Sequence, residues 1–487
     1  MKTLLVTCAA LLMLAACGGG GSTTTPAAGN AALSVSTSGT ITAFGSVFVN
    51  GVRYDVSSAA LKKNGRSVAQ SQLAVGEVAL VHGRQDLASG QGSADSVEVE
   101  DNVVGPIAAI SADGTQLTAL GQTINVTAST SFASNIVPAD VTGLKPGDVI
   151  EVSGLAGANG AIAATRIGRA PADESLQVLG DVSALDSGNH VFHVNGLAVD
   201  YTAAALSGFA SGQPADGDLV VARGTQFDAT AVQFTATVVE RAHTDPTEDV
   251  DGQHAASGRV EVEGLVTNFS SAADFEVAGV KVSASDSTVY EHGSAADLAD
   301  SARVEVRGTL DANKVLQADR IEIGHVAALM LVAPAAQVDS TATPNTLQLL
   351  GVTVAVDAST RFEDKSSAAL QMFTLKDVHD GDTIAVRGYE SPAGSGRLLA
   401  RELERLPAST QVAVRGPCTA TTAPQFMILG VTIDATSASF GHVEEGGSMT
   451  SSDFFAQAAG QIVEVRGTAA GSTITATQVA IDSIEDR

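Results

Sequence analysis

The sequence predicts an all-β chain: a tandem array of about six small five-stranded β-barrel modules, OB-like or SH3-like, after a lipoprotein signal peptide and a flexible tether. Three recurring patterns lead to this fold class. An eight-residue segment with alternating apolar residues occurs six times, a segment with a central glycine precedes it, and a short apolar segment follows it. Apolar alternation with a period of two is typical of strands that bury one face.

The eight-residue segment, here called the octapeptide, ends on a glycine and recurs at intervals of 70 to 84 residues. Its fourth and sixth residues are nearly always apolar, as in Ile150 and Val152, and polar residues commonly stand between or beside them. The opening Gly-Asp of several copies favours a turn, and the closing glycine allows a sharp exit or a β-bulge. We therefore expect one strand from each copy. The copies are GEVALVHG (76–83), GDVIEVSG (147–154), GDLVVARG (217–224), SARVEVRG (301–308), GDTIAVRG (381–388) and GQIVEVRG (460–467).

The segment before each octapeptide predicts a β-hairpin, because apolar residues alternate on both sides of a central glycine. Asn50-Gly51 and Asn195-Gly196 are the dipeptide that best suits a tight primed turn. The six segments are VFVNGVRYDV (47–56), LTALGQTINV (117–126), FHVNGLAVDY (192–201), FEVAGVKVSA (275–284), LQLLGVTVAV (347–356) and FMILGVTIDA (426–435).

The segment after the octapeptide predicts a closing strand, as in ATRI (164–167), ADRIEI (318–323), ARELE (400–404) and ATQVAI (476–481). Stretches between hairpin and octapeptide, such as 366–377 and 451–460, favour one or two helical turns. Each module then has about five strands, with a short helix before the fourth. Small sheets avoid exposed edges by closing, which favours an OB-like or SH3-like barrel.

These motifs divide the chain into segments. The acidic stretch between the third and fourth modules has no apolar period, and we expect it to separate the modules into two groups of three. The predicted segments are a signal peptide (1–16), the lipidated cysteine and tether (17–37), β modules (38–101, 102–170, 177–241, 258–324, 325–406 and 410–487) and an acidic linker (242–257).

The N-terminus has the features of a bacterial lipoprotein signal. Lys2 precedes an apolar run from Leu4 to Leu14 that is too short to span a bilayer. The run ends in Leu-Ala-Ala-Cys (14–17), which looks like a lipobox, because two small residues precede a cysteine whose thiol takes a diacylglyceryl group. We predict cleavage before Cys17 and membrane anchoring through acyl chains such as palmitate on Cys17. Gly18 in place of aspartate favours the outer membrane, with the modules facing the periplasm or the cell surface.

Composition narrows the classes of partner. The net charge of -27 repels phosphate backbones, so we expect no nucleic acid as partner. Aromatic residues are only 4% of the chain and Trp is absent, which counts against stacking platforms for single strands and sugars. The partners that remain are the membrane, through Cys17, and envelope proteins or polysaccharide.

Cysteine usage predicts no internal disulfide. Cys8 leaves with the signal peptide, Cys17 takes the lipid, and Cys418 is then alone. The modules must therefore be stable by β packing. We interpret Cys418 as a small buried apolar residue rather than a reactive thiol.

The sequence offers only a weak candidate metal site. Asp-Val-Asp-Gly (249–252) matches part of a calcium loop, but alignment on Gly252 places Thr247 at position one and Gly258 at position twelve, so two carboxylate ligands are missing. A solvated acidic linker is the favoured interpretation. The motifs GxSxG, HExxH, Walker A and GxGxxG do not occur in the sequence, so we expect no catalytic residue and no cofactor. The weak calcium candidates are Asp245, Glu248, Asp249 and Asp251.

The order of these motifs resembles the bacterial family catalogued as domain of unknown function 5666. The second and fourth modules match it best, through GDVIEVSG (147–154) with ATRI (164–167), and through FEVAGVKVSA (275–284) with SARVEVRG (301–308). The first module departs from the pattern with His82-Gly83, and the fourth lacks the opening Gly-Asp. The resemblance implies an envelope location and repeated β barrels, and it implies no activity and no functional residues.

Two functions remain open from the sequence. One is a non-catalytic envelope lipoprotein whose repeats form a scaffold or a surface for binding or adhesion. The other is an enzyme or solute-binding component with a site in a cleft between modules. The nine histidines are spread thinly along the chain, which favours the scaffold.

Overall fold

The computed structural model describes residues 33–44, 46–86, 91–127, 129–172, 174–247, 259–324, 329–392, 394–442 and 448–482. In these residues the strands form three sheets of 12, 13 and 13 strands, and the one α-helix is α1 (Ser451–Gln457). The all-β fold class is therefore confirmed. None of the helices in these ranges combines the length and apolar character needed to cross a membrane. The predicted signal peptide, Cys17 and most of the tether fall outside the described residues.

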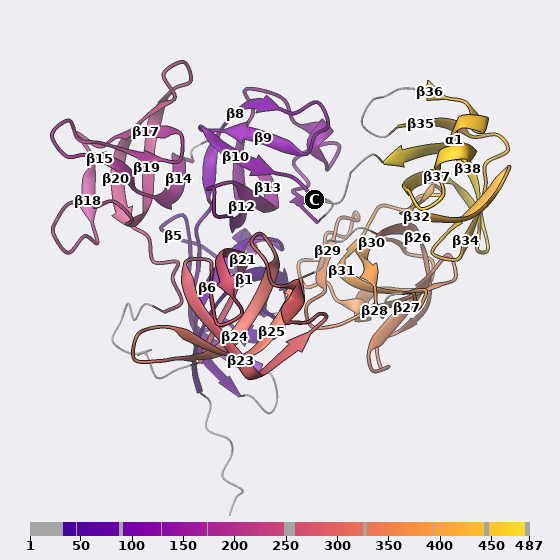
Figure 1. Cartoon of the computed structure of the whole chain (residues 1–487), viewed down its shortest axis with the longest axis horizontal. Coiled ribbons are helices and arrows are strands. Elements are labelled where there is room, and N and C mark those ends of the chain that lie inside the picture. Colours follow the sequence, from indigo (N-terminus) through magenta and orange to yellow (C-terminus); the bar gives the residue numbers. More distant parts are fainter. Residues whose placement is uncertain are drawn as a thin grey trace, which may run out of the picture. The chain divides into compact units, whose positions relative to one another are not determined.

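Strand pairing forms closed circuits that follow the sequence repeat, two in each sheet (Figure 1). Each circuit has five main strands: a first strand, the two strands of the glycine-centred hairpin, the octapeptide strand and the closing strand, counted here as one to five. The second and third strands form a hairpin, and the fifth pairs antiparallel with the fourth and parallel with the third. In five circuits the first strand pairs with the second and the fourth, whereas in circuit 3 it is split, so that residues 176–181 pair with the fourth strand and residues 183–186 with the second. This order, 1-2-3-5-4-1, is that of an OB-like barrel. The circuits are named by their residues: circuit 1 (33–99), circuit 2 (103–169), circuit 3 (176–241), circuit 4 (259–324), circuit 5 (329–405) and circuit 6 (412–482).

The first sheet contains circuits 1 and 4. Circuit 1 consists of β1 (Leu33–Ala43), β2 (Val47–Val49), β3 (Val52–Asp55), β4 (Ala60–Lys63), β5 (Arg66–Ser67), β6 (Val78–Asp86) and β7 (Gln91–Val99), with a 3₁₀ turn at Gln70–Gln72. Circuit 4 consists of β21 (Arg259–Ser271), β22 (Asp274–Val277), β23 (Val280–Glu291), β24 (Arg303–Leu310) and β25 (Leu316–Gly324), with a 3₁₀ turn at Ala295–Asp297.

The second sheet contains circuits 2 and 3. Circuit 2 consists of β8 (Val103–Ile110), β9 (Gln116–Ala119), β10 (Gln122–Asn125), β11 (Ser131–Phe132), β12 (Val149–Ala156) and β13 (Ile162–Arg169), with a 3₁₀ turn at Val141–Gly143. Circuit 3 consists of β14 (Leu176–Asp181), β15 (Ser183–Asp186), β16 (Val191–Val194), β17 (Leu197–Asp200), β18 (Ala205–Ser207), β19 (Leu219–Asp228) and β20 (Gln233–Arg241).

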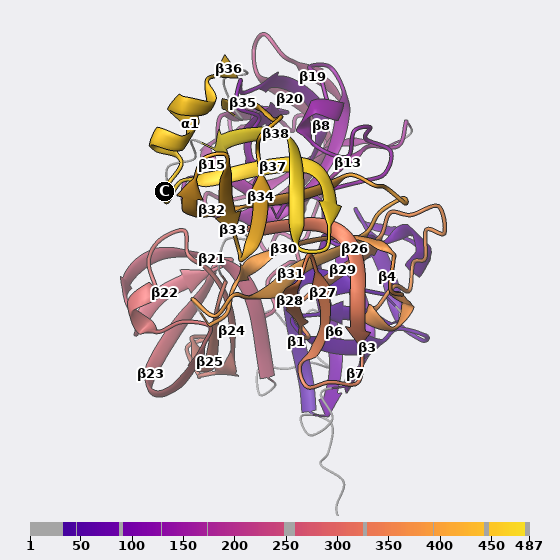
Figure 2. The same cartoon turned by 90° about the vertical axis from the view of Figure 1, so that its right-hand side faces the viewer.

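The third sheet contains circuits 5 and 6, and α1 belongs to circuit 6 (Figure 2). Circuit 5 consists of β26 (Leu329–Asp339), β27 (Asn345–Leu349), β28 (Val352–Val356), β29 (Arg361–Asp364), β30 (Thr383–Glu390) and β31 (Arg397–Arg405), with a 3₁₀ turn at Leu375–Asp377. Circuit 6 consists of β32 (Val412–Thr422), β33 (Gln425–Ile428), β34 (Val431–Asp434), β35 (Ser439–His442), β36 (Ser448–Met449), β37 (Ile462–Ala470) and β38 (Thr473–Asp482).

The strand and hairpin predictions are confirmed. Each octapeptide contributes to one long strand, and these strands are β6, β12, β19, β24, β30 and β37. Each glycine-centred segment forms a hairpin. In the first hairpin, Asn50 and Gly51 have φ angles of 50° and 71°, as a type I′ turn requires. Leu350 adopts the same left-handed conformation, with φ 54°. The helical turns expected within 366–377 and 451–460 are the 3₁₀ turn of circuit 5 and α1.

The closing glycine of the octapeptide marks a β-bulge in all six circuits. The register between the fourth and fifth strands shifts at this glycine in each of them. A Cβ on Gly224 would lie 2.2 Å from the carbonyl oxygen of Thr235 on the fifth strand. The same contact at the other five glycines is 2.0 to 2.5 Å. No side chain fits there, because real Cβ atoms do not approach a backbone oxygen so closely.

The predicted grouping of the modules into two sets of three is wrong. The first strands of two circuits join them into one sheet, and β1 pairs in parallel with β21 across the acidic stretch. The first sheet therefore combines residues from both sides of the predicted linker. The other two sheets are joined by the antiparallel pairs β8–β14 and β26–β32. The distant pair β1–β21 is possible because a long connection costs little more entropy than a short one.

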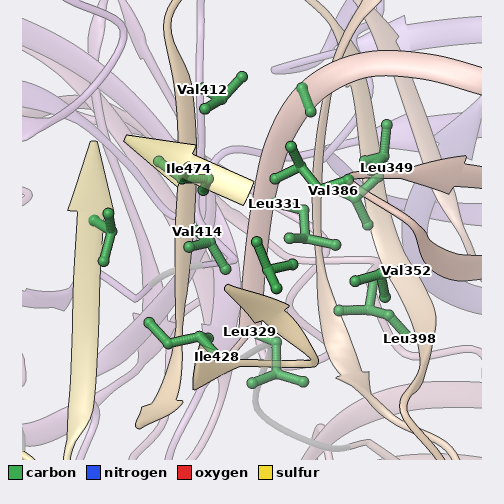
Figure 3. Packing of buried hydrophobic residues seen from close by; sticks show 14 of the residues in the cluster. Leu329, Leu331, Leu349, Val352, Val386, Leu398, Val412, Val414, Ile428 and Ile474 are labelled. Carbon is green, nitrogen blue, oxygen red and sulfur yellow. The ribbon is translucent and has the colours of Figure 1, made fainter. Parts of the chain in front are cut away.

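The hydrophobic core is shared between circuits in two of the sheets. Figure 3 shows Leu331 and Val386 of circuit 5 in the same cluster as Val414 and Ile428 of circuit 6. Circuits 2 and 3 also share one cluster, whereas circuits 1 and 4 each have a cluster of their own. The circuits are therefore not six barrels with six separate cores.

Candidate functional site

The pair of Asp364 and Arg405 is buried within circuit 5, but many other buried charged side chains lie where circuits meet. They point outward from the barrels, at strand positions between the core residues, and other circuits cover them. The octapeptide contributes its fifth and seventh residues to these junctions, such as Glu151, Glu305 and Arg307. The sequence shows polar residues at these positions without indicating a role for them, because alternation alone does not distinguish a solvated face from a covered one.

One junction surrounds Lys63 of circuit 1. Its Nζ lies 2.6 Å from Glu77 and 3.0 Å from Glu151 of circuit 2, and 3.6 Å from Asp101, which lies between the two circuits. Burial and the nearby Asp101 carboxylate together raise the pKa of Glu151 to about 7, against the opposing effect of Lys63. Three carboxylates therefore share one ammonium group in a place with little water.

A second junction is an ionic ladder on the outer face of circuit 5. Arg361 lies 2.6 Å from Glu402, and Arg387 lies 3.1 Å from Glu402 and 3.2 Å from Glu404. Burial alone would raise the pKa of Glu404, but Lys365 and Arg387 hold it at about 2. Arg361 also donates a hydrogen bond of 2.8 Å to the carbonyl of Ser129 in circuit 2.

The same ladder contains the one group of metal-ligand side chains in the described residues. Oxygens of Glu363, Glu402 and Glu404 lie within 4.8 Å of one another. Oxygen ligands suit calcium or magnesium. Lys365, Arg361 and Arg387 already neutralise these three carboxylates, however, so a metal would have to displace their ion pairs. The geometry therefore fits a structural ion-pair network better than a metal centre.

Circuits 1 and 4 enclose an unusual carboxyl group at their junction. Glu261 lies on β21, 1% exposed, and neither of its oxygens has a hydrogen-bond partner among the described residues. Its nearest cation is Arg307, whose Nε lies 3.7 Å away. Burial raises the pKa of Glu261. A neutral carboxylic acid is the form that costs least in such a place.

A small polar cavity of about 40 Å³ lies where circuits 1, 2, 4 and 5 meet. Its wall contains three arginines and three glutamates. The volume suits a few water molecules and is far below that of a typical small-molecule site. The charged residues of the wall are Glu263, Arg303, Glu305, Arg361, Arg401 and Glu402.

Of the four predicted calcium ligands, the structure describes only one. Asp245 is described, and its Oδ1 accepts a hydrogen bond of 2.7 Å from the backbone N–H of Thr247, which is an ordinary turn contact. Glu248, Asp249 and Asp251 lie outside the described residues, as does Cys17. Cys418 lies on β32, 1% exposed, and burial raises the pKa of its thiol to about 11. This thiol stays protonated at neutral pH, which agrees with its interpretation as a core residue.

A comparison with protein families matches one family, described as Domain of unknown function (DUF5666). The matched ranges are residues 104–168, 263–322, 336–404 and 415–480, which fall on circuits 2, 4, 5 and 6 and cover more than half of the chain. Circuits 1 and 3 have the same strand order without being in the matched ranges. No curated protein matches the chain. The chain thus belongs to the DUF5666 family, whose domain it carries in four matched copies.

Proposed function

We propose that this protein is a lipid-anchored component of the cell envelope, whose barrels form a non-catalytic scaffold that presents a binding surface. The observation that carries the proposal is the use of the buried charges. Strongly perturbed ionisable groups often mark active sites. In this protein the carboxyl groups with strongly shifted pKa values, such as Glu151, Glu305 and Glu404, form ion pairs around the junctions between circuits.

Ion pairs of this kind favour a role in holding the barrels in a fixed arrangement over a role in catalysis. Removing one partner of a buried pair leaves an uncompensated charge, which costs about 3–5 kcal/mol. A chain that joins its barrels in this way resists sliding of one barrel over another. The proposed partners are envelope proteins or polysaccharide, and the proposed anchor is the lipid on Cys17 at the outer membrane.

The anchor is tested by Cys17→Ala. We expect the wild-type protein to sediment with membranes after a high-salt wash and the variant to appear in the soluble fraction, folded, with an unchanged circular dichroism spectrum. Acyl chains hold a protein to a membrane by burying apolar methylene groups, which salt does not weaken. Cys418→Ala is the matched control, because it removes a thiol from a buried site and leaves the anchor intact. A Cys17→Ala protein that stays with washed membranes contradicts the proposal.

The scaffold is tested by capture of partners from intact cells with the lipid-free chain. Lys63→Met leaves three carboxylates without their ammonium group. We expect it to destabilise the junction between circuits 1 and 2 and, as a consequence, to weaken the capture of partners. The control is Lys62→Met, because Lys62 is 46% exposed in its ion pair with Glu98. Loss of capture with an intact junction, measured by hydrogen exchange of β6 and β12, would point instead to a local binding site at Lys63.

A further inference from the structure

The strand pair that joins circuits 1 and 4 is short and has little apolar support. Residues 35–38 of β1 pair in parallel with residues 259–262 of β21. Circuits 1 and 4 each have a hydrophobic cluster of their own, whereas circuits 2 and 3 share one, as do circuits 5 and 6. The polar side chains beside the β1–β21 pair therefore affect this junction more than such side chains affect the other two strand pairs that join circuits.

Glu261 lies in the middle of this pair. Its register partners are Thr37 on β1 and Arg307 on β24. Val260 and Val262, its neighbours along the strand, belong to the core of circuit 4, so Glu261 points outward from that barrel. It is 1% exposed, and neither of its oxygens has a hydrogen-bond partner among the described residues. The carboxyl group is thus enclosed at the junction without a hydrogen bond.

The arginines near Glu261 are paired with other carboxylates. Three of them lie close enough to affect its pKa, and each forms an ion pair elsewhere. Arg307 Nε lies 3.7 Å from Glu261, which is beyond hydrogen-bond reach. A proton is therefore the counter-charge that remains for Glu261. The three ion pairs are Arg307 with Glu305 (2.7 Å), Arg259 with Asp319 (2.9 Å) and Arg320 with Glu291.

The titratable group that circuit 1 brings to this place is Tyr54. Its hydroxyl lies 2.7 Å from Thr37 Oγ1 and forms a hydrogen bond with it. Burial raises the pKa of Tyr54, and the Glu261 carboxyl raises it further. The phenol therefore stays neutral at physiological pH, and it does not compensate an ionised Glu261.

Glu263 on the same strand shows what Glu261 lacks. It lies two residues further along, on the same outward face, and it is 8% exposed. Its carboxylate accepts a hydrogen bond of 2.8 Å from the backbone N–H of Thr40 and lies 2.5 Å from Arg303. These two partners hold the pKa of Glu263 below its usual range in spite of burial. The two carboxyl groups therefore differ in their partners and not in their depth.

We propose that Glu261 acts as a proton latch on this junction: the protonated side chain stays enclosed between circuits 1 and 4, and loss of its proton releases the β1–β21 pair. An isolated carboxylate is far more costly to bury than a carboxylic acid, so ionised Glu261 requires water. Separation of β1 from β21 admits this water. It also exposes two unpaired strand edges, which are the surfaces that another chain uses for strand addition.

Proton linkage sets the direction of the switch. Burial raises the pKa of Glu261 in the closed junction above the value of about 4.5 that an exposed glutamate has. The contribution of Glu261 to closure is therefore full below about pH 4.5 and is lost as pH rises through the raised pKa. Glu305, the other carboxyl group beside Arg307, has a pKa of about 8 and should lose its proton in the same opening. Between about pH 5 and pH 7, each proton lost on opening raises the opening constant about tenfold per pH unit.

The experiment is hydrogen exchange of the full chain, measured by mass spectrometry between about pH 5 and pH 7, with each rate divided by the intrinsic rate at that pH. We expect the opening constant of β1 and β21 to rise more steeply in the wild type than in Glu261→Gln, by about tenfold per pH unit. The double variant Glu261→Gln/Glu305→Gln should be less steep again by about the same factor. Strand β37 of circuit 6 is the internal reference, and its exchange should not depend on residue 261.

Glu263→Gln is the matched control. Glu263 is ionised in this pH range whether the junction is closed or open, so its replacement should weaken the junction without changing the slope. Glu261→Met has no polar atom to bury and should give the same reduced slope as Glu261→Gln, even if the buried amide destabilises the junction. Equal slopes in the wild type and in both Glu261 variants overturn the proposal. A reduced slope that β37 shows equally also overturns it, because the proton then reports unfolding of the whole chain.

Discussion

At the residue scale, the junctions show how burial and a partner charge decide the state of a carboxyl group. Glu404 and Glu305 are both buried on the outer faces of barrels. Glu404 has Lys365 and Arg387 close by, and its pKa falls to about 2. Burial raises the pKa of Glu305 to about 8, because Arg307 only partly offsets it and the carboxylates of Glu322 and Glu261 add to it. Neighbouring charges, rather than depth alone, separate the two groups.

Glu305 should make the junction between circuits 1 and 4 sensitive to pH. Its pKa is higher in the folded than in the unfolded chain, so its contribution to stability is full below about pH 4.5 and is lost as pH rises through about 8. Glu305→Gln should remove this loss. Relative to the wild type, the variant should therefore raise the midpoint of thermal unfolding more at pH 8 than at pH 5. We expect a difference of about 3–4 kcal/mol, because the loss spans nearly three pKa units between pH 5 and pH 8 and one unit is worth about 1.4 kcal/mol.

The control for this prediction is Glu464→Gln, which makes the same change at the same octapeptide position in circuit 6. Glu464 pairs with the exposed Arg466, so its replacement should leave the pH dependence as it is in the wild type. An equal change in the two variants would show that the effect comes from net charge and not from the junction.

At the element scale, the octapeptide strand was largely predictable. Its apolar alternation gives the buried face, and its glycine gives the bulge. The left-handed turns were predictable at Asn50-Gly51, because this dipeptide favours a type I′ turn. The left-handed turn at Leu350-Gly351 was less predictable from the sequence. Here leucine adopts a positive φ, and its side chain packs against the core that circuits 5 and 6 share.

Replacement of the bulge glycine should be costly. In Gly224→Ala the new Cβ would meet the carbonyl oxygen of Thr235, so the fourth and fifth strands must separate. We expect a loss of about 1–3 kcal/mol, as for other overpacked sites, measured by urea unfolding. Gly196→Ala in the same circuit is the control, since its nearest atom lies 4.0 Å away and its φ is outside the left-handed region. Equal losses in both variants would mean that the bulge tolerates a side chain.

At the scale of the whole molecule, the sequence predicted the repeat but not the partners of each barrel. The residues that join circuits carry no distinctive pattern: β1 pairs with β21 through ordinary strand residues such as Val35 and Arg259. The outward charges of the junctions also look like solvated residues in the sequence. These features depend on which barrel packs against which other barrel, and a single sequence does not indicate this packing. Cys17 and the acidic stretch stay predictions from the sequence alone.

Shared cores set how far damage to one barrel should spread. Val152→Asp places a charge in the core that circuits 2 and 3 share, and a buried unpaired charge costs several kcal/mol. We expect both circuits to unfold together and limited proteolysis to leave a fragment that covers circuits 4 to 6.

The matched change, Val304→Asp, lies in the core that belongs to circuit 4 alone. It should leave residues 103–241 resistant to protease. Digestion of the whole chain in either variant would mean that all the circuits unfold as one cooperative unit, and digestion of circuit 2 alone in Val152→Asp would restore the picture of separate barrels.

The parallel pair between β1 and β21 has a consequence for the order in which the protein is made. A chain synthesised from its N-terminus completes circuit 1 long before residue 259 exists, and more than two hundred residues must follow before Val35 meets its register partner. Until then the outer edge of β1 exposes unpaired backbone groups, which are a template for misassembly between nascent chains. The N-terminal barrel is therefore captured only after circuits 2 and 3 have been made and circuit 4 has begun to emerge, and newly made protein is most vulnerable in that interval.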